Sequence, residues 1–190
     1  MADADITLSV AKLVEELHNA GGQLGEEALG RLAGQIASGF KVRKHEVAFL
    51  LVSPNGQTLG FLFPTKLAKL GVIALSTTES LATRTVRERR AELVNNFPAY
   101  KHPSVFEAVD LSEDAKAAPI QKIISAPMIV EDKVVGVIQV SRKGKPGDPI
   151  GPDFTPHDAA DLVSVATVLG KFLRTFSAAP ASPAQPAPTP

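Results

Sequence analysis

The chain has 190 residues, of which 44% are hydrophobic and 21% charged, so it has enough apolar material for a core, and its length favours a single domain. Its 20 basic residues balance its 20 acidic residues, so no net charge is available to hold nucleic acid or an anionic membrane. It has no cysteine, which excludes disulfides, thiolate metal sites, iron–sulfur clusters, covalently attached haem or bilin and cysteine nucleophiles.

Neither a membrane span nor a secretory signal is expected. No apolar run approaches the ~18 residues that a spanning helix needs. The first five residues, Met1-Ala2-Asp3-Ala4-Asp5, are acidic where a signal peptide would be basic. We therefore expect a cytoplasmic protein.

The first half of the chain predicts two helices followed by strands. Apolar residues recur at helical spacing over residues 6–19 and again over residues 29–40. The compact apolar run Val47–Val52 indicates a strand, and Ser53-Pro54-Asn55-Gly56 indicates a turn. Leu59–Phe63 then returns as the second strand of a hairpin, and Gly71–Leu75 predicts a short third strand.

The middle of the chain predicts a helix, a short strand and a long irregular stretch. Ser76-Thr77-Thr78-Glu79 has the spacing of a capping box, so we expect a helix from there to about Arg90. Glu92–Asn95 resembles a strand, and residues 96–118 show no periodicity. This irregular stretch holds three aromatic residues, Phe97, Tyr100 and Phe106.

The strongest hairpin pattern comes next. Residues 123–130 and 134–141 are two strand-like runs around Glu131-Asp132-Lys133. Pro127 has no amide hydrogen, so we expect it at a bulge or on a free edge. Gly136 has no side chain, which indicates a close approach by another element.

The last helix begins near Thr155, whose hydroxyl suits an N-cap, with Pro156 at the first helical position. Apolar residues recur along it to residue 176. Val163 and Val168 are apolar outside that stripe, which indicates that more than one side of this helix is covered. The last fourteen residues, 177–190, contain five prolines, five alanines and no charge, so they predict a disordered or polyproline-II tail. Antiparallel strands with helices at both chain ends indicate the α+β class.

Three segments of the second half resemble a GAF domain: Ile124-Ser125-Ala126-Pro127-Met128-Ile129, Val135-Gly136-Val137-Ile138-Gln139-Val140 and Phe154-Thr155-Pro156-His157-Asp158. Three departures accompany the resemblance. Arg142-Lys143 stands where the family often has Asn-Lys, Ala159 where many members have Glu, and Asn96 where Asp is frequent. The resemblance covers residues 24–176, leaving an N-terminal helical extension over 1–23 and the tail over 177–190.

The resemblance implies a central antiparallel sheet of five or six strands, with the N- and C-terminal helices on one face. On the other face, the middle helix and the long loop would form a pocket for a small molecule. The family senses cyclic nucleotides, haem, bilins, oxoacids, nitrate and other ligands, and some members only dimerise. Since residues 1–23 and 177–190 are too short for an output domain, the output is expected from a separate signalling effector protein.

Six residues are candidates for contact with a ligand. Five of them fall where the resemblance implies the pocket wall: Asn95, Asn96, Phe97, Tyr100 and Phe106. Their amides and rings suit hydrogen bonding and stacking, although the aromatic residues of this loop would equally serve as a plug. The sixth is Arg84, from the cluster of Arg84, Arg87, Arg89 and Arg90, which could hold a phosphate or an acidic partner. The alternative is a solvated helix face neutralised by Glu79, Glu88 and Glu92.

We expect no catalysis, metal or cofactor. The four histidines show no ligand spacing, and no nucleophile elbow, P-loop or His-Glu-x-x-His motif occurs. The GAF enzymes that reduce free methionine sulfoxide need cysteines. The leading hypothesis is a sensory domain that binds a small molecule reversibly and signals through the terminal helices of a homodimer. The alternative is a ligand-free dimerisation or adaptor module for a signalling partner.

Overall fold

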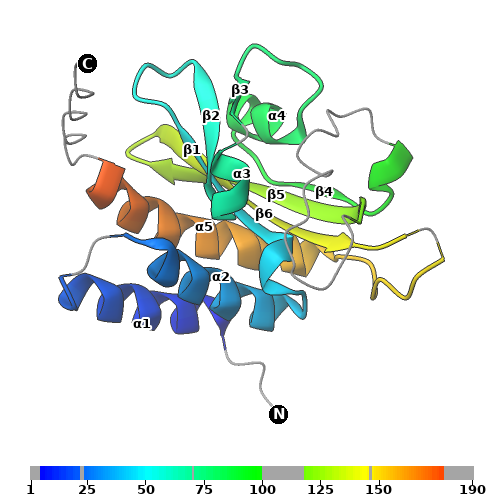
Figure 1. Cartoon of the computed structure of the whole chain (residues 1–190), viewed down its shortest axis with the longest axis horizontal. Coiled ribbons are helices and arrows are strands. Elements are labelled where there is room, and N and C mark those ends of the chain that lie inside the picture. Colours follow the sequence, from blue (N-terminus) through cyan, green and yellow to red (C-terminus); the bar gives the residue numbers. More distant parts are fainter. Residues whose placement is uncertain (1–4, 22–23, 70, 100–117, 146, 178–190) are drawn as a thin grey trace, which may run out of the picture.

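Figure 1 shows the computed structural model of the chain, which describes residues 5–21, 24–69, 71–99, 118–145 and 147–177. The described residues form a six-stranded antiparallel sheet in the order β3-β2-β1-β6-β5-β4. The strands are β1 (Val47–Val52), β2 (Thr58–Phe63), β3 (Val72–Ala74), β4 (Glu92–Val94), β5 (Ile120–Val130) and β6 (Lys133–Lys143). The sheet with its helices confirms the expected α+β class.

Helices cover both faces of the sheet, but very unequally (Figure 1). The three long helices, α1 (Ile6–Asn19), α2 (Glu26–Phe40) and α5 (Pro156–Ser177), form a layer on one face. The other face carries the short helices α3 (Thr65–Ala68) and α4 (Leu81–Glu88). Two 3-10 turns, η1 (Lys44–Glu46) and η2 (Phe97–Ala99), lie before β1 and after β4.

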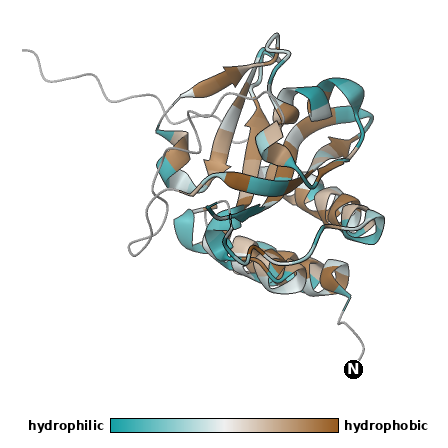
Figure 2. Ribbon diagram, turned by 90° about the vertical axis from the view of Figure 1, so that its right-hand side faces the viewer, coloured by the Kyte–Doolittle hydropathy of each residue, from teal (hydrophilic) through white to brown (hydrophobic). Residues whose placement is uncertain are grey.

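The alternation of side chains along the central strands decides which residues meet the helical layer. Val47 and Phe49 of β1 belong to the cluster packed against that layer, whereas Leu50 belongs to a separate cluster on the opposite face. In β6, Ile138 faces the helices and Val137 faces away from them. Figure 2 shows that the strands are mostly hydrophobic, whereas the helices mix hydrophobic and hydrophilic residues.

The helical layer supplies most of the buried residues in the larger of the core clusters. Leu32 and Ile36 of α2 and Leu162, Leu169 and Leu173 of α5 are fully buried. Each such side chain contributes about 1.5–3 kcal/mol of burial free energy. The N-termini of α1 and α5 are capped by side chains. The side chain of Asp5 accepts from two amides at the start of α1, and at the start of α5 Thr155 and Asp158 bond to each other's amide nitrogens.

The start and end of the middle helix differ from the prediction. The capping box at Ser76–Glu79 is wrong: Ser80 is the N-cap of α4, and its hydroxyl accepts from the amide of Thr83 at 3.5 Å. The hydroxyl of Thr83 lies 2.7 Å from the carbonyl of Thr77, which ties the preceding segment to the helix as a turn. The helix ends at Glu88 rather than Arg90 because Arg89 takes up the left-handed conformation, with φ at 55°.

The β5–β6 hairpin is longer than predicted, with a tight turn in which Glu131 and Asp132 both have positive φ. Pro127 pairs with Val137 of β6, but the ladder to β4 ends at Ser125, so β5 has a free edge beside Pro127. This agrees with the expectation that a residue without an amide hydrogen sits at an edge.

Gly136 lies where neighbouring strands leave no room for a side chain, as the expectation of a close approach suggested. A Cβ atom there would lie 2.3 Å from the carbonyl oxygen of Leu50 and 2.5 Å from the side chain of Met128. A backbone carbonyl in the middle of a ladder cannot move aside without loss of strand pairing.

We therefore predict that Gly136→Ala lowers the free energy of unfolding by about 1–3 kcal/mol, the usual cost of overpacking. The matched control is Gly60→Ala in β2, because the nearest atom to its added Cβ lies at an ordinary 3.5 Å. Urea unfolding of the three proteins measures the difference. Equal unfolding midpoints for Gly136→Ala and Gly60→Ala would contradict this account of the strand contact.

Candidate functional site

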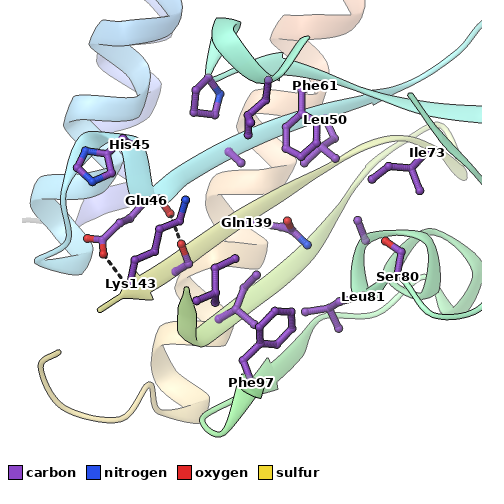
Figure 3. Close-up of a pocket in the computed structure, with 17 residues that line it drawn as sticks. His45, Glu46, Leu50, Phe61, Ile73, Ser80, Leu81, Phe97, Gln139 and Lys143 are labelled. Atoms are coloured by element: carbon purple, nitrogen blue, oxygen red, sulfur yellow. Dashed lines mark hydrogen bonds between the residues drawn. The ribbon is translucent and has the colours of Figure 1, made fainter. Parts of the chain in front are cut away.

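A cavity of about 90 Å³ lies on the sheet face that the long helices leave uncovered (Figure 3). Strands β1, β2, β5 and β6 form its floor, and α4, η2 and β3 border it. Its apolar wall is formed by Ala48, Leu50, Phe61, Pro64, Leu67, Ile73, Leu81, Ala82, Phe97, Ile120 and Ile123. Its polar residues are His45, Glu46, Ser80, Gln139, Ser141 and Lys143. The site is thus an apolar pocket with a few polar groups.

Glu46 and its partners close one end of the pocket. The Glu46 carboxylate accepts from the Arg43 guanidinium at 2.7 Å, from the Arg43 amide at 2.7 Å and from the Lys143 amide at 2.6 Å. The hydroxyl of Ser141 donates to the Glu46 carbonyl at 3.1 Å. Burial raises the pKa of Glu46, but the hydrogen bonds from Arg43 and Lys143 and the charge of Arg43 outweigh it, so the pKa lies below its usual value. At this end of the pocket, the Glu46 carboxylate is therefore paired within the protein by charge and hydrogen bonds.

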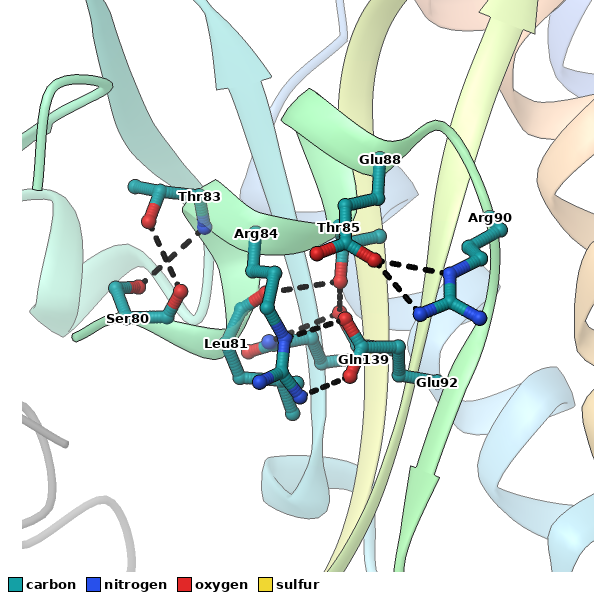
Figure 4. Close-up of polar contacts among 10 residues, drawn as sticks. Ser80, Leu81, Thr83, Arg84, Thr85, Glu88, Arg90, Glu92 and Gln139 are labelled. Carbon is teal, nitrogen blue, oxygen red and sulfur yellow. Dashed lines mark hydrogen bonds and ion pairs between the residues drawn. The ribbon is translucent and has the colours of Figure 1, made fainter. Parts of the chain in front are cut away.

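A second polar group lies at the floor of the pocket and consists of Gln139 of β6, Ser125 of β5 and Thr85 of α4 (Figure 4). Gln139 of β6 lies opposite Ala48 of β1 and opposite Ser125 of β5. Its Nε2 atom lies 3.2 Å from the hydroxyl of Ser125, which lies 2.7 Å from the hydroxyl of Thr85 in α4. Ser125 and Thr85 are fully buried. A hydrogen-bonded chain thus joins the pocket floor to α4.

Of the six candidate ligand residues, Phe97 lines the pocket and is buried. Asn95 is occupied by the protein: its amide nitrogen donates to the carbonyl of Phe154 at 3.0 Å and its oxygen accepts from the amide of Phe154 at 2.9 Å. It therefore ties the end of β4 to the start of α5. Asn96 is exposed. Tyr100 and Phe106 lie outside the described residues, so their place in the pocket wall stays a prediction.

Arg84 lies on α4 outside the pocket lining and forms a bidentate ion pair with Glu92 of β4 (Figure 4). Two of its neighbours in the arginine cluster are also paired: Arg89 lies 3.9 Å from Asp132, and Arg90 lies 2.8 Å from Glu88. These contacts agree with the interpretation of a helix face neutralised by nearby carboxylates. A role for Arg84 in ligand contact stays a prediction.

Sequence reasoning missed most of the pocket, above all Leu50, Phe61 and Gln139. A signal was nevertheless present. Ser125, Gln139 and Ser141 are polar residues next to buried apolar ones in β5 and β6, and they share one face by alternation. Polar side chains at such positions indicate that this face covers something other than a dry core.

Arg142, at one of the family-pattern departures, also lies outside the pocket lining. Its guanidinium stacks on the ring of Phe154 at 4.6 Å and donates to the carbonyls of Phe40 and Lys41. It joins the end of α2 to the start of α5. The residue therefore has a structural role on the far side of β6.

Neither a metal site nor a membrane helix is found in the described part of the chain. No group of three or more histidine or acidic side chains is arranged to hold an ion there. None of the helices described combines the length and the apolar character that crossing a membrane requires.

The sequence model of the GAF domain family matches residues 26–173. The chain belongs to the GAF domain family. None of the curated proteins matches it. Among solved structures, the GAF domain of an Acinetobacter phosphoenolpyruvate-protein phosphotransferase is 17% identical, with a TM-score of 0.63, and the similarity covers 90% of this chain and 95% of that one. The free methionine-R-sulfoxide reductase of Neisseria meningitidis, solved in complex with its substrate, is 15% identical, with a TM-score of 0.60 and coverage of 90% and 87%.

At these identities the likenesses establish the fold alone. They confirm the expected arrangement of a central antiparallel sheet with the terminal helices on one face. The GAF family is a general sensory and regulatory fold, mostly non-catalytic. The solved structures similar to this chain include residues 122 to 287 of a methyl-accepting chemotaxis protein and the free methionine-R-sulfoxide reductases. This chain has no cysteine.

The ion pair and hydrogen bonds of Glu46 lead to a prediction about stability and pH. Glu46→Gln should lower the free energy of unfolding by about 1.5–3 kcal/mol at pH 7, because charged hydrogen bonds at a buried carboxylate are lost. Since the folded-state pKa is depressed, the wild-type advantage is present above the usual carboxyl value of 4.5 and is lost as the pH falls through the folded-state pKa.

Denaturant unfolding from pH 3 to pH 7 measures this advantage. Glu131→Gln is the control, since its pair with Arg174 is exposed and should make no measurable difference. An advantage of Glu46 that persists unchanged at pH 3 would contradict the assignment.

Proposed function

We propose that this GAF domain is a sensory module that binds a small, mainly apolar molecule reversibly in the pocket over β1, β6 and β5. The observation that carries the proposal is the pocket itself. It is concave, its walls are apolar, and its few polar side chains are held in place by bonds to the protein, which is the usual composition of a ligand site. Phe97 supplies an aromatic wall, and Tyr100 and Phe106 are proposed to extend it.

We further propose that the signal leaves through α1 and α5, in a homodimer. These helices leave an apolar groove between them, lined in part by Val14, Val168 and Phe172, and Val163 of α5 is 41% exposed. The groove and Val163 together form an apolar strip on α1 and α5, and a second copy of the chain packed against this strip would bury it. Strands β5 and β6 touch the pocket with one face and α5 with the other, so a ligand that favours one arrangement of these strands changes the affinity of the helices for each other.

We also propose that the domain is non-catalytic and cytoplasmic, and that it passes its signal to a separate signalling protein. Reduction of a sulfoxide on this fold requires cysteine thiols, which the chain lacks. The proposed effector would contact the exposed sides of α1 and α5.

A second function, a ligand-free adaptor, is favoured by one observation. The apolar strip of α1 and α5 would support dimerisation whether or not the pocket is filled. The two functions differ in whether a compound in the pocket stabilises the fold.

Filling the pocket tests the sensory function. We predict that a compound screen by thermal shift finds ligands that stabilise the wild type, and that Ala48→Phe removes the effect because the ring occupies the pocket floor. A ligand at 100 times its Kd adds about 2.7 kcal/mol. Ala74→Phe, on the exposed edge strand β3, is the matched control and should keep the shift. A screen without any stabilising compound, or an undiminished shift in Ala48→Phe, would favour the adaptor.

Charge on the apolar strip tests the dimer. We predict that wild-type chain sediments as a dimer and that the double variant Val163→Lys/Val168→Lys sediments as a monomer, because two lysines cannot be buried unpaired. Val72→Lys is the control, since Val72 is 62% exposed on β3, away from these helices. A monomeric wild type would sink the dimer proposal, as would a double variant that stays dimeric.

A further inference from the structure

The buried chain of hydroxyls under the pocket has a direction, and that direction determines what the pocket offers a ligand. The hydroxyl of Thr85 lies 2.9 Å from the carbonyl oxygen of Leu81 and 2.7 Å from the hydroxyl of Ser125. Nε2 of Gln139 lies 3.2 Å from the same Ser125 oxygen. A carbonyl oxygen only accepts, and each hydroxyl has one proton to give.

Only one arrangement provides a proton for all three contacts. Thr85 donates to the Leu81 carbonyl, Ser125 donates to Thr85, and the amide nitrogen of Gln139 donates to Ser125. If the Gln139 amide were turned over, Ser125 would have to donate to it and Thr85 to Ser125, which leaves the Leu81 contact without a proton. Because Thr85 and Ser125 are fully buried, a lost bond there is costly.

The amide of Gln139 is therefore oriented by α4 and β5, and its Oε1 atom is the group left to face the pocket (Figures 3 and 4). No other described residue bonds to that oxygen. Gln139 lies in the middle of the floor, between the apolar side chains of β1 and the wall formed by Leu81 and Phe97.

Resting on the function proposed above, we infer that Gln139 determines ligand specificity as a fixed hydrogen-bond acceptor. The ligand class that fits is a small, predominantly apolar molecule with an N–H or O–H donor on the edge that meets β6. A ligand that presents only acceptors at this point would place two oxygen lone pairs against each other, away from water. Such molecules are rejected because the Gln139 oxygen would be left unpaired.

A matched pair of probes tests this inference. Indole and benzofuran have nearly the same shape, but only indole carries an N–H donor. Both are titrated into the full chain and followed by ¹H–¹⁵N NMR. The ratio of indole to benzofuran affinity is expected to fall about tenfold from wild type to Gln139→Met, which keeps the side-chain length and removes the acceptor. Gln121→Met is the control, because Gln121 bonds to the Gly144 carbonyl outside the pocket, and the ratio should not change.

The outcomes separate this inference from the proposed function. An affinity ratio that Gln139→Met leaves unchanged overturns the inference while the pocket still binds both probes. A wild type whose pocket resonances respond to neither probe overturns both the proposed function and the inference. A readout without ligand covers the case in which a variant fails to fold: in the wild type, the Gln139 side-chain amide protons should show an NOE to the Ser125 Hβ protons. Absence of that NOE overturns the inferred orientation.

Discussion

Burial of β6 on both of its faces is the constraint on which the rest of this structure depends. Ile138 and Val140 face the helical layer, whereas Val137 and Gln139 face the pocket side. A strand in this position needs apolar residues in both directions, and it leaves no room for a side chain at Gly136, where β1 comes too close. The position of β6 therefore determines where the helices pack and where the pocket opens.

The same constraint places the pocket and the long helices back to back. Ile123 of β5 faces the pocket, while Ile124 and Met128 of the same strand pack in the core beneath the helices. Contact with α5 is close: a Cβ atom on Gly170 would lie 3.2 Å from both Met128 and Val130. In a sensor built this way, displacement of β5 by a ligand cannot be absorbed by loose packing, because interiors are close-packed.

Much of the fold follows from local sequence pattern. The two hairpins, the long helices and the Thr155–Asp158 cap are specified by alternation, helical spacing and turn residues within a few positions, so they could be predicted. The start of α4 could not, because Ser76–Glu79 and Ser80–Thr83 both offer plausible caps and the contact of Thr83 with Thr77 decides between them. Local pattern does not contain that contact.

The site was less accessible to sequence reasoning, for a similar reason. The aromatic and amide residues of 95–106 were predicted as ligand contacts from their residue types. Asn95 instead bonds to the backbone of Phe154, 59 positions away. Most of the pocket comes instead from ordinary apolar strand residues, such as Leu50 and Phe61, which no motif distinguishes. The sequence signal for the pocket is limited to the polar residues on the pocket-facing side of β5 and β6.

The most direct test of this view of the molecule is methyl NMR of the full chain titrated with indole. The methyl groups of Leu50, Leu81 and Ile123 face the pocket, whereas those of Leu32 and Ile36 lie in the core beneath the helices. Binding in the pocket predicts that the largest shift changes occur at the first three. Changes that are largest at Val14 and Val168, in the groove between α1 and α5, would place the ligand on the helices and contradict the proposed division of the molecule into a sensing face and a signalling face.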